Sequence, residues 1–166
     1  MGRTRKLKKD KSRWPYKYYA GLTAKQAEKR RKEILKFGKM DWRDPKAYVG
    51  FETDKIPHKS RKSSYTAQWN RLFPNAKSLE ERSAVTGVPL KYIKKSFDRA
   101  RAAWAKTGHR VGENPYSWGY PRTASLILCG KSHYTADSDL VREAKRHSAK
   151  ARKWFKRCKT SKLTNT

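Results

Sequence analysis

The stretch that decides the fold is SLEERSAVTGVPLKYIKKSFDRARAAW, which covers residues 78–104. Ser78 followed three residues later by Glu81 forms a capping box, so a helix is predicted to begin here. Gly87 is placed to end that helix, because glycine adopts a left-handed backbone without steric cost. Pro89 predicts the start of a second helix, since its missing N–H is not needed at a first helical position. The stretch therefore predicts two helices joined by a tight turn.

The second helix of this αα-hairpin, which extends over residues 78–106, has one apolar and one basic face. Its apolar residues recur at helical spacing and predict the buried face: Leu90, Ile93, Phe97, Ala100 and Trp104. The other face carries Lys91, Lys95 and Arg99. A helix-turn-helix that places its second helix in a DNA major groove has this layout, and so does an ordinary helical hairpin with a solvated face. Both interpretations stay open.

The chain is strongly basic along its whole length. Its 166 residues include 43 Lys and Arg against 14 Asp and Glu, which gives a net charge of +29. The excess is high at both ends, in residues 1–13 and 142–166, and continues between them. Such a charge repels itself unless a polyanion or an acidic protein surface neutralises it. With six Trp, nine Tyr and five Phe, the chain is nevertheless expected to fold.

Several classes of protein are not expected. The sequence has no apolar run long enough to span a bilayer and no signal peptide. Cys129 and Cys158 have no zinc-binding spacing, and they are predicted to be reduced thiols in a reducing compartment. Asp137 and Asp139 are interpreted as capping residues at a helix start rather than as metal ligands. We therefore expect no catalytic residue, no metal, no cofactor and no small-molecule substrate.

Outside the hairpin, the sequence predicts three further helices. One begins at Thr23 and ends before Gly38, and a short one is capped by Ser64. The last is predicted to run without a break over 138–157, with His147 on its apolar side. Between the hairpin and this last helix, Pro115 can start a further helical stretch, but Pro121 inside it predicts a short turn, a kink and a second segment through Leu128.

The predicted fold is mainly α: a small helical domain that contains the helix-turn-helix-like hairpin and has extended basic arms. The expected divisions are a basic and aromatic arm (1–20), a helix with an irregular partner-binding segment (21–62), a helical core domain (63–157) and a tail (158–166).

Two groups of residues are candidate binding residues. The first group combines exposed basic positions of the hairpin and of the last helix, and it is predicted to bind nucleic acid: Lys91, Lys95, Arg99, Arg142, Lys145, Arg146 and Lys153. The second group gathers basic and aromatic residues of the arm and of the irregular segment, and it is predicted to bind partner proteins: Arg3, Arg5, Lys6, Trp14, Tyr16, Trp42, Tyr48 and Phe51.

From about residue 42 to 155 the chain resembles an uncharacterised domain of large DNA viruses that infect algae and amoebae, with relatives in phages. The matching pieces are WRDPKAYVGF (42–51), SSYTAQW (63–69), TGVPLKYIKK (86–95), AAWAKTGHR (102–110), YSWGY (116–120) and YTADSDL (134–140). One departure is the Pro121-Arg122 pair, which stands where the family has Ala-Arg. No functional residue carries over, because the domain has no established activity.

The resemblance implies a protein of the virion that is made in the host cytoplasm or nucleus. We favour a non-enzymatic structural role, as a minor capsid or core-associated component that binds other virion proteins. The alternative is a protein that binds double-stranded DNA, either to condense the genome or through the helix-turn-helix.

Overall fold

The structure is a computed structural model that describes residues 15–47, 51–57 and 62–159. All regular elements in these ranges are helices, so the predicted mainly α class is confirmed. The chain divides into two compact units. Unit 1 comprises Met1–Ser60 with Thr107–Asn114, and unit 2 comprises Arg61–Lys106 with Pro115–Thr166.

Unit 1 is built around one long helix, α1 (Ala24–Phe37), with three short 3₁₀ turns: η1 (Tyr16–Tyr18), η2 (Pro45–Ala47) and η3 (Glu52–Lys55). Thr23 caps α1 as predicted and forms a capping box with Gln26, and Gly38 lies at its C-cap. Segment 39–62, predicted to be irregular, contains only η2 and η3 among its described residues.

A buried arginine organises unit 1. The Arg30 side chain is fully buried and donates hydrogen bonds to Thr53 and Asp54 of η3, at 3.0 and 2.7 Å. Its other terminal nitrogen donates to the carbonyl oxygens of His109 and Arg110, at 2.8 and 2.9 Å. These bonds join residues 107–114 to α1, which is why that loop lies in unit 1 and not in the predicted core domain. The sequence could not show that partnership, because the groups are about eighty residues apart.

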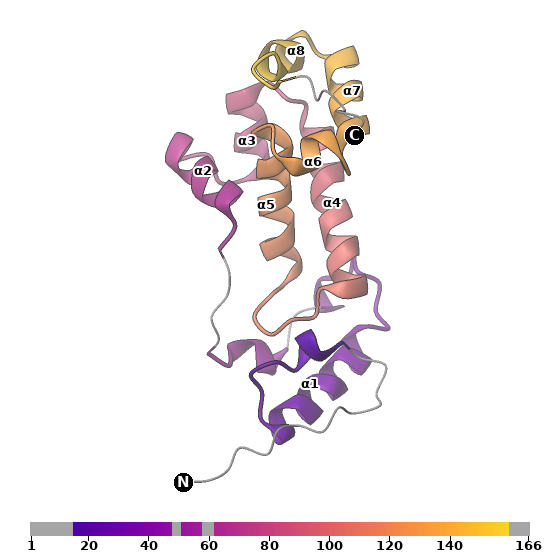
Figure 1. The fold of residues 1–166 in the computed structure, drawn as a ribbon. Helices are drawn as coiled ribbons and strands as arrows, with labels where there is room; N and C mark the ends of the chain where they lie inside the picture. The colour runs from indigo at the N-terminus through magenta and orange to yellow at the C-terminus, as the bar shows by residue number, and fades with distance from the viewer. Residues whose placement is uncertain (1–14, 48–50, 58–61, 160–166) are drawn as a thin grey trace, which may run out of the picture. The chain divides into compact units, whose positions relative to one another are not determined.

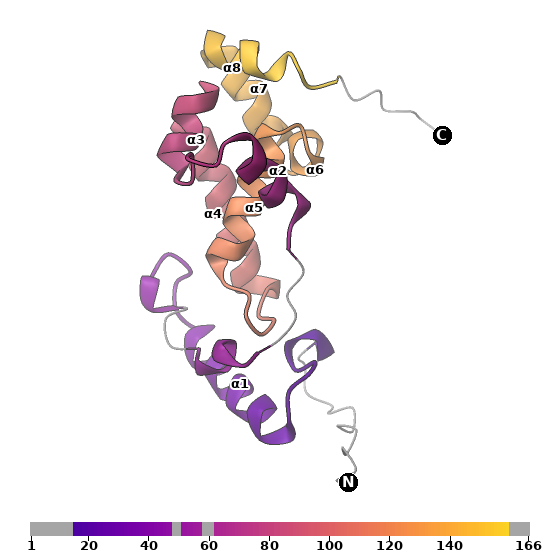
Figure 2. The ribbon, with the colours of Figure 1, turned by 90° about the vertical axis from the view of Figure 1, so that its left-hand side faces the viewer.

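Unit 2 holds seven helices along the described part of the chain: α2 (Ser64–Leu72), α3 (Leu79–Thr86), α4 (Leu90–Thr107), α5 (Pro115–Ile127), α6 (Lys131–Tyr134), α7 (Ser138–His147) and α8 (Ala149–Phe155). The two long helices, α4 and α5, lie side by side in both views of the fold (Figures 1 and 2). The core gathers residues from nearly every helix, among them Trp69, Ile93, Ile127, Leu140 and Phe155.

The hairpin predicted from the sequence is confirmed as α3 and α4. Ser78 Oγ accepts from the Glu81 N–H at 3.1 Å, and the Glu81 carboxylate accepts from the Ser78 N–H at 2.9 Å. Gly87 ends α3 in the left-handed conformation, with φ 75°. Along α4, the predicted apolar face is buried except for Leu90, which is partly exposed.

The helix after the hairpin was predicted to break, and this prediction is wrong. α5 runs through Pro121 from Pro115 to Ile127. The proline removes one backbone hydrogen bond. Thr123, Ala124 and Ile127 are nevertheless completely buried, and their packing supports the helix after the proline.

The last helix was predicted to be continuous, and it is not. Ser148 has extended backbone angles, φ −140° and ψ 118°, so it separates α7 from α8, and its hydroxyl caps α8 by accepting from the Ala151 N–H. The helical phase changes at this point. His147, the last residue of α7, was predicted to be a core residue, but it is exposed and lies 3.2 Å from the Glu143 carboxylate.

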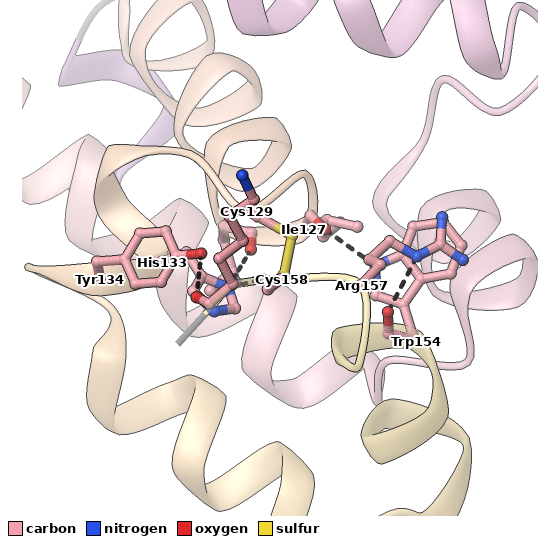
Figure 3. Close-up of a disulfide and its surroundings, with 9 residues drawn as sticks. Ile127, Cys129, His133, Tyr134, Trp154, Arg157 and Cys158 are labelled. Carbon is pink, nitrogen blue, oxygen red and sulfur yellow. Dashed lines mark hydrogen bonds between the residues drawn. A yellow bond between two sulfur atoms is a disulfide. The ribbon is translucent and has the colours of Figure 1, made fainter. Parts of the chain in front are cut away.

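The prediction of two reduced thiols is also wrong, because Cys129 and Cys158 form a disulfide (Figure 3). The bond joins the turn after α5 to the segment that follows α8, with 5.3 Å between the two Cα atoms. Closing a loop with a sequence separation of 29 contributes about 3–4 kcal/mol in the chain-entropy description. Spacing in the sequence cannot reveal this pair, because the fold brings the residues together.

Candidate nucleic-acid interface

Four contacts fix the relation between α4 and α7, the two helices that carry most of the predicted nucleic-acid-binding residues. Asp137, immediately before α7, accepts from the Ser96 hydroxyl in the middle of α4 at 2.7 Å. Arg99 of α4 donates to both oxygens of Asp139, at 2.8 and 2.6 Å. Ser148, immediately after α7, contacts the Gly87 carbonyl at 3.4 Å. α7 therefore spans the first half of α4 with the opposite chain direction.

Basic side chains extend from the Arg99–Asp139 ion pair along both helices. On α4, Lys95 and Lys91 lie one and two turns from Arg99 on the same side of the helix, and both are exposed. On α7, Arg142 and Arg146 are three and seven residues beyond Asp139, again on one side and exposed. Both rows run toward Gly87 and Ser148. We call Lys91, Lys95, Arg142 and Arg146 the basic face.

The acidic groups next to the basic face are already occupied. Glu143 lies 3.7 Å from Arg146 and 3.2 Å from His147, and Asp139 is bound by Arg99. Lys94, on the flank of α4, lies 3.5 Å from Glu80. Because Arg146 belongs to the basic face, Glu143 offsets part of its charge, and Lys91, Lys95 and Arg142 carry most of the remaining positive charge.

Arg99 differs from the cations of the basic face, because its side chain is 38% exposed and is held by acidic partners. Its guanidinium binds Asp139, the Asp137 carboxylate at 3.2 Å and the Ala136 carbonyl at 2.9 Å. These contacts raise the pKa of Arg99 further above its ordinary value, chiefly through the Asp139 hydrogen bonds. A cation held in this way is part of the fold, and its charge is largely neutralised before any ligand arrives.

Asp137 is the centre of the same network, and it does not cap α7 as predicted. Its side chain is fully buried, and Arg122 donates to both carboxylate oxygens at 2.9 and 2.7 Å. Burial alone would raise the pKa of Asp137, but Arg122, Ser96 and Arg99 together outweigh burial and lower it. The network thus joins α4, α5 and the start of α7.

The remaining predicted cations lie elsewhere on unit 2. Lys145 is partly exposed and close enough to His133 to reinforce the lowering of that pKa, which burial mainly causes. Lys153 lines a groove between α3 and α8, together with Lys150 and Arg157. Neither Lys150 nor Arg157 was among the predicted binding residues, although the last helix was predicted to include both; in the structure Lys150 and Lys153 lie on one side of α8 and Arg157 follows its end.

A buried arginine of α3 is structural. Arg82 donates to the Tyr120 carbonyl at 2.9 Å and to the Thr123 hydroxyl at 2.7 Å. Its guanidinium carbon lies 5.0 and 5.1 Å from the ring centroids of Trp69 and Tyr120. Burial lowers the pKa of Arg82 to about 10, and the charge is stabilised by the two rings and the hydrogen bonds.

The predicted partner-binding residues have different environments in unit 1. Tyr16 is 75% exposed, and Trp42 is partly exposed beside Arg43. Phe51 is buried against Phe37, with the ring centroids 4.8 Å apart, so its own unit covers it, and it offers no exposed binding surface. The other predicted residues lie outside the described ranges: Arg3, Arg5, Lys6, Trp14 and Tyr48.

The carboxylates that could be mistaken for a metal site are held by cations. Asp137 and Asp139 bind arginines, and across the described ranges no cluster of three or more His, Cys, Asp or Glu is arranged to hold a metal ion. In the same ranges, every helix is too short or too polar to cross a bilayer. The chemistry that the described site offers is charge attraction and hydrogen-bond donation to an anion.

Comparison with known proteins identifies a family whose function is unknown. No curated protein and no solved structure matches the chain. One family model matches residues 15–162, nearly the whole chain, and its description is a family of unknown function, DUF5824. The chain therefore belongs to the DUF5824 family.

Proposed function

We propose that this chain is a non-enzymatic protein that binds double-stranded DNA through the basic face of unit 2. The observation that carries the proposal is the convergence of two exposed basic rows, one on α4 and one on α7, at the start of the helix that follows the α3–α4 turn. In helix-turn-helix proteins the beginning of the second helix approaches the base edges, and neighbouring cations contact phosphates.

The net charge of +29 supports attraction to DNA, but it predicts no particular surface. The experiment must therefore separate the basic face from general charge. We expect the variant K91Q/K95Q/R142Q/R146Q to bind a 20-base-pair duplex more weakly, with a shallower dependence of log K on log salt. Each lost phosphate contact should reduce that slope by roughly one unit.

The matched control removes four exposed lysines of unit 1, in the variant K25Q/K36Q/K39Q/K46Q. Both variants have the same net charge. Fluorescence anisotropy over a series of NaCl concentrations compares them. The control should retain a salt slope close to that of the unmodified chain, whereas equal losses in the two variants would mean that DNA senses only the total charge.

We further propose that the setting of this binding is the particle of a large DNA virus. The resemblance of residues 42–155 to a domain of such viruses supports this setting, as does a basic surface suited to a packaged genome. A role as a minor capsid or core-associated component makes a distinct prediction. After purified particles are opened and treated with nuclease, a genome-bound protein leaves the shell fraction, and a shell-bound protein stays with it.

A further inference from the structure

A second basic site lies outside the basic face, in a groove between α3 and α8. The groove has a volume of about 350 Å³ and is formed by the last turn of α3, Gly87 and one side of α8. Lys150 and Lys153 of α8 line it, together with Arg157 just after the helix, and all three are exposed. None of the described residues that line the groove is acidic.

The groove has a fixed shape because α3 and α8 approach closely at Gly87. A Cβ atom added to Gly87 would lie 2.6 Å from Lys150 Cβ, and φ is 75° at this glycine. The Ser148 hydroxyl contacts the Gly87 carbonyl at 3.4 Å. The α3–α4 turn therefore holds α8 at a defined position.

Arg157 is also held in place before any ligand binds. Its guanidinium carbon lies 3.6 Å from the centroid of the Trp154 ring, and its Nε donates to the Trp154 carbonyl at 3.0 Å (Figure 3). The Trp154 indole in turn donates to the Ile127 carbonyl at 2.9 Å, and the next residue after Arg157 is the disulfide-bonded Cys158. A side chain ordered in this way loses less entropy when it binds.

The C-terminal end of α3 disfavours binding of an anion in the groove, because the C-terminal end of a helix carries about half a negative charge. One of the carbonyls there, that of Gly87, already faces the Ser148 hydroxyl. Against this partial charge stand the full charges of Lys150, Lys153 and Arg157. The balance in the groove favours an anionic ligand of high charge density.

We propose that the groove between α3 and α8 binds a phosphate group, carried by a nucleic-acid backbone or by a small phosphate ester. Arg157 offers a planar guanidinium to the phosphate oxygens, and Lys150 and Lys153 add point charges. The site does not depend on DNA binding by the basic face. It uses other residues, and a free phosphate compound is sufficient to fill it.

The test is a titration of the full chain with inorganic pyrophosphate. NMR monitors binding through the signals of the Gly87 amide and the Trp154 indole. We expect saturable shifts of both signals at near-physiological salt. The variant K153Q/R157Q should weaken the affinity by roughly tenfold or more. The control variant K25Q/K39Q, which removes two exposed charges of unit 1, should bind like the unmodified chain.

Two further variants keep the test decisive. R157K retains the charge but loses the planar guanidinium, and it should bind with intermediate affinity. If K153Q/R157Q does not fold, the pyrophosphate affinity of K153Q alone tests the proposal, because Lys153 is exposed and the fold should tolerate the change. Equal pyrophosphate affinity in K153Q and K25Q would overturn the proposal, as would shifts that never saturate.

A parallel titration with a 12-base-pair duplex distinguishes the sources of the phosphate. Shifts of Gly87 and Trp154 with the duplex support a nucleic-acid backbone, and shifts with pyrophosphate alone support a small phosphate ester. Failure of the proposed DNA function would look different: K91Q/K95Q/R142Q/R146Q would bind DNA like its control, and the pyrophosphate titration would not change.

Discussion

Asp137 is the residue whose loss should damage unit 2 most specifically. Its buried carboxylate accepts from Ser96 and Arg122 and faces Arg99 at 3.2 Å. Asp137→Asn should lower the free energy of unfolding by about 3 kcal/mol, because it leaves the arginines without their shared counterion. Urea denaturation measures the change.

The control for this variant is Asp139→Asn. The Asp139 side chain is 47% exposed, so its pairing with Arg99 contributes about 1 kcal/mol or less. Equal losses in the two variants would mean that burial of Asp137 has no energetic consequence.

The same carboxylates make stability depend on pH. The Arg99 hydrogen bonds lower the pKa of Asp139 from 3.8 to about 2, and the pKa of Asp137 is also lowered. A lowered pKa in the folded chain gives stability that is present above the ordinary value and is lost as pH falls through the folded value. The free energy of unfolding should therefore fall between about pH 4 and 2. Asp139→Asn should show a shallower fall in urea titrations over this range, and an unchanged slope would contradict the assignment.

At the scale of elements, the contact between α4 and α5 depends on Gly119. A Cβ atom at this position would collide with the Phe97 ring. Alanine normally stabilises a helix relative to glycine by about 1 kcal/mol, but overpacking of the buried Phe97 costs about 1–3 kcal/mol. The difference between these terms means that Gly119→Ala should lower the free energy of unfolding by up to about 2 kcal/mol.

A double-mutant cycle with Phe97→Leu supplies the check, since the smaller side chain makes room for the added methyl group. The double variant should lose less stability than the sum of the two single losses. Strict additivity would show that the Phe97 ring does not limit the space at Gly119.

Elements specified by local patterns could be predicted from the sequence. The capping boxes at Thr23 and Ser78 involve residues three apart, so the starts of α1 and α3 were foreseen. The break at Ser148 was missed, because serine is also acceptable within a helix and only the packing of α8 selects the extended backbone.

The candidate site was predictable only in part, because some of its features depend on contacts between segments that are distant in the sequence. The exposed positions of Lys91, Lys95, Arg142 and Arg146 follow from helical spacing. The neutralisation of Arg99 does not, because Asp137 and Asp139 are about forty residues away in the sequence. The disulfide and the groove beside Gly87 likewise arise from contacts between distant segments.

For the molecule as a whole, the net charge of +29 should make salt act in opposite directions on folding and on DNA binding. Like charges distributed over the chain oppose compaction, and salt screens them, since the Debye length falls from roughly 14 Å at 50 mM to about 4 Å at 500 mM. The free energy of unfolding should therefore rise with NaCl. Ion pairs such as Arg99–Asp139 weaken under the same conditions, but exposed pairs contribute too little to reverse the trend.

Urea denaturation at 50 and 500 mM NaCl, beside duplex binding at the same concentrations, measures both responses. DNA affinity should fall steeply, because added salt removes the gain from released counterions. A free energy of unfolding that fell with salt would mean that the ion pairs outweigh the repulsion, and the excess charge would then need no polyanion to balance it. If the free energy of unfolding rises with salt while DNA affinity falls, repulsion between like charges limits the stability of the chain. An anionic partner bound at the basic face would then relieve that repulsion.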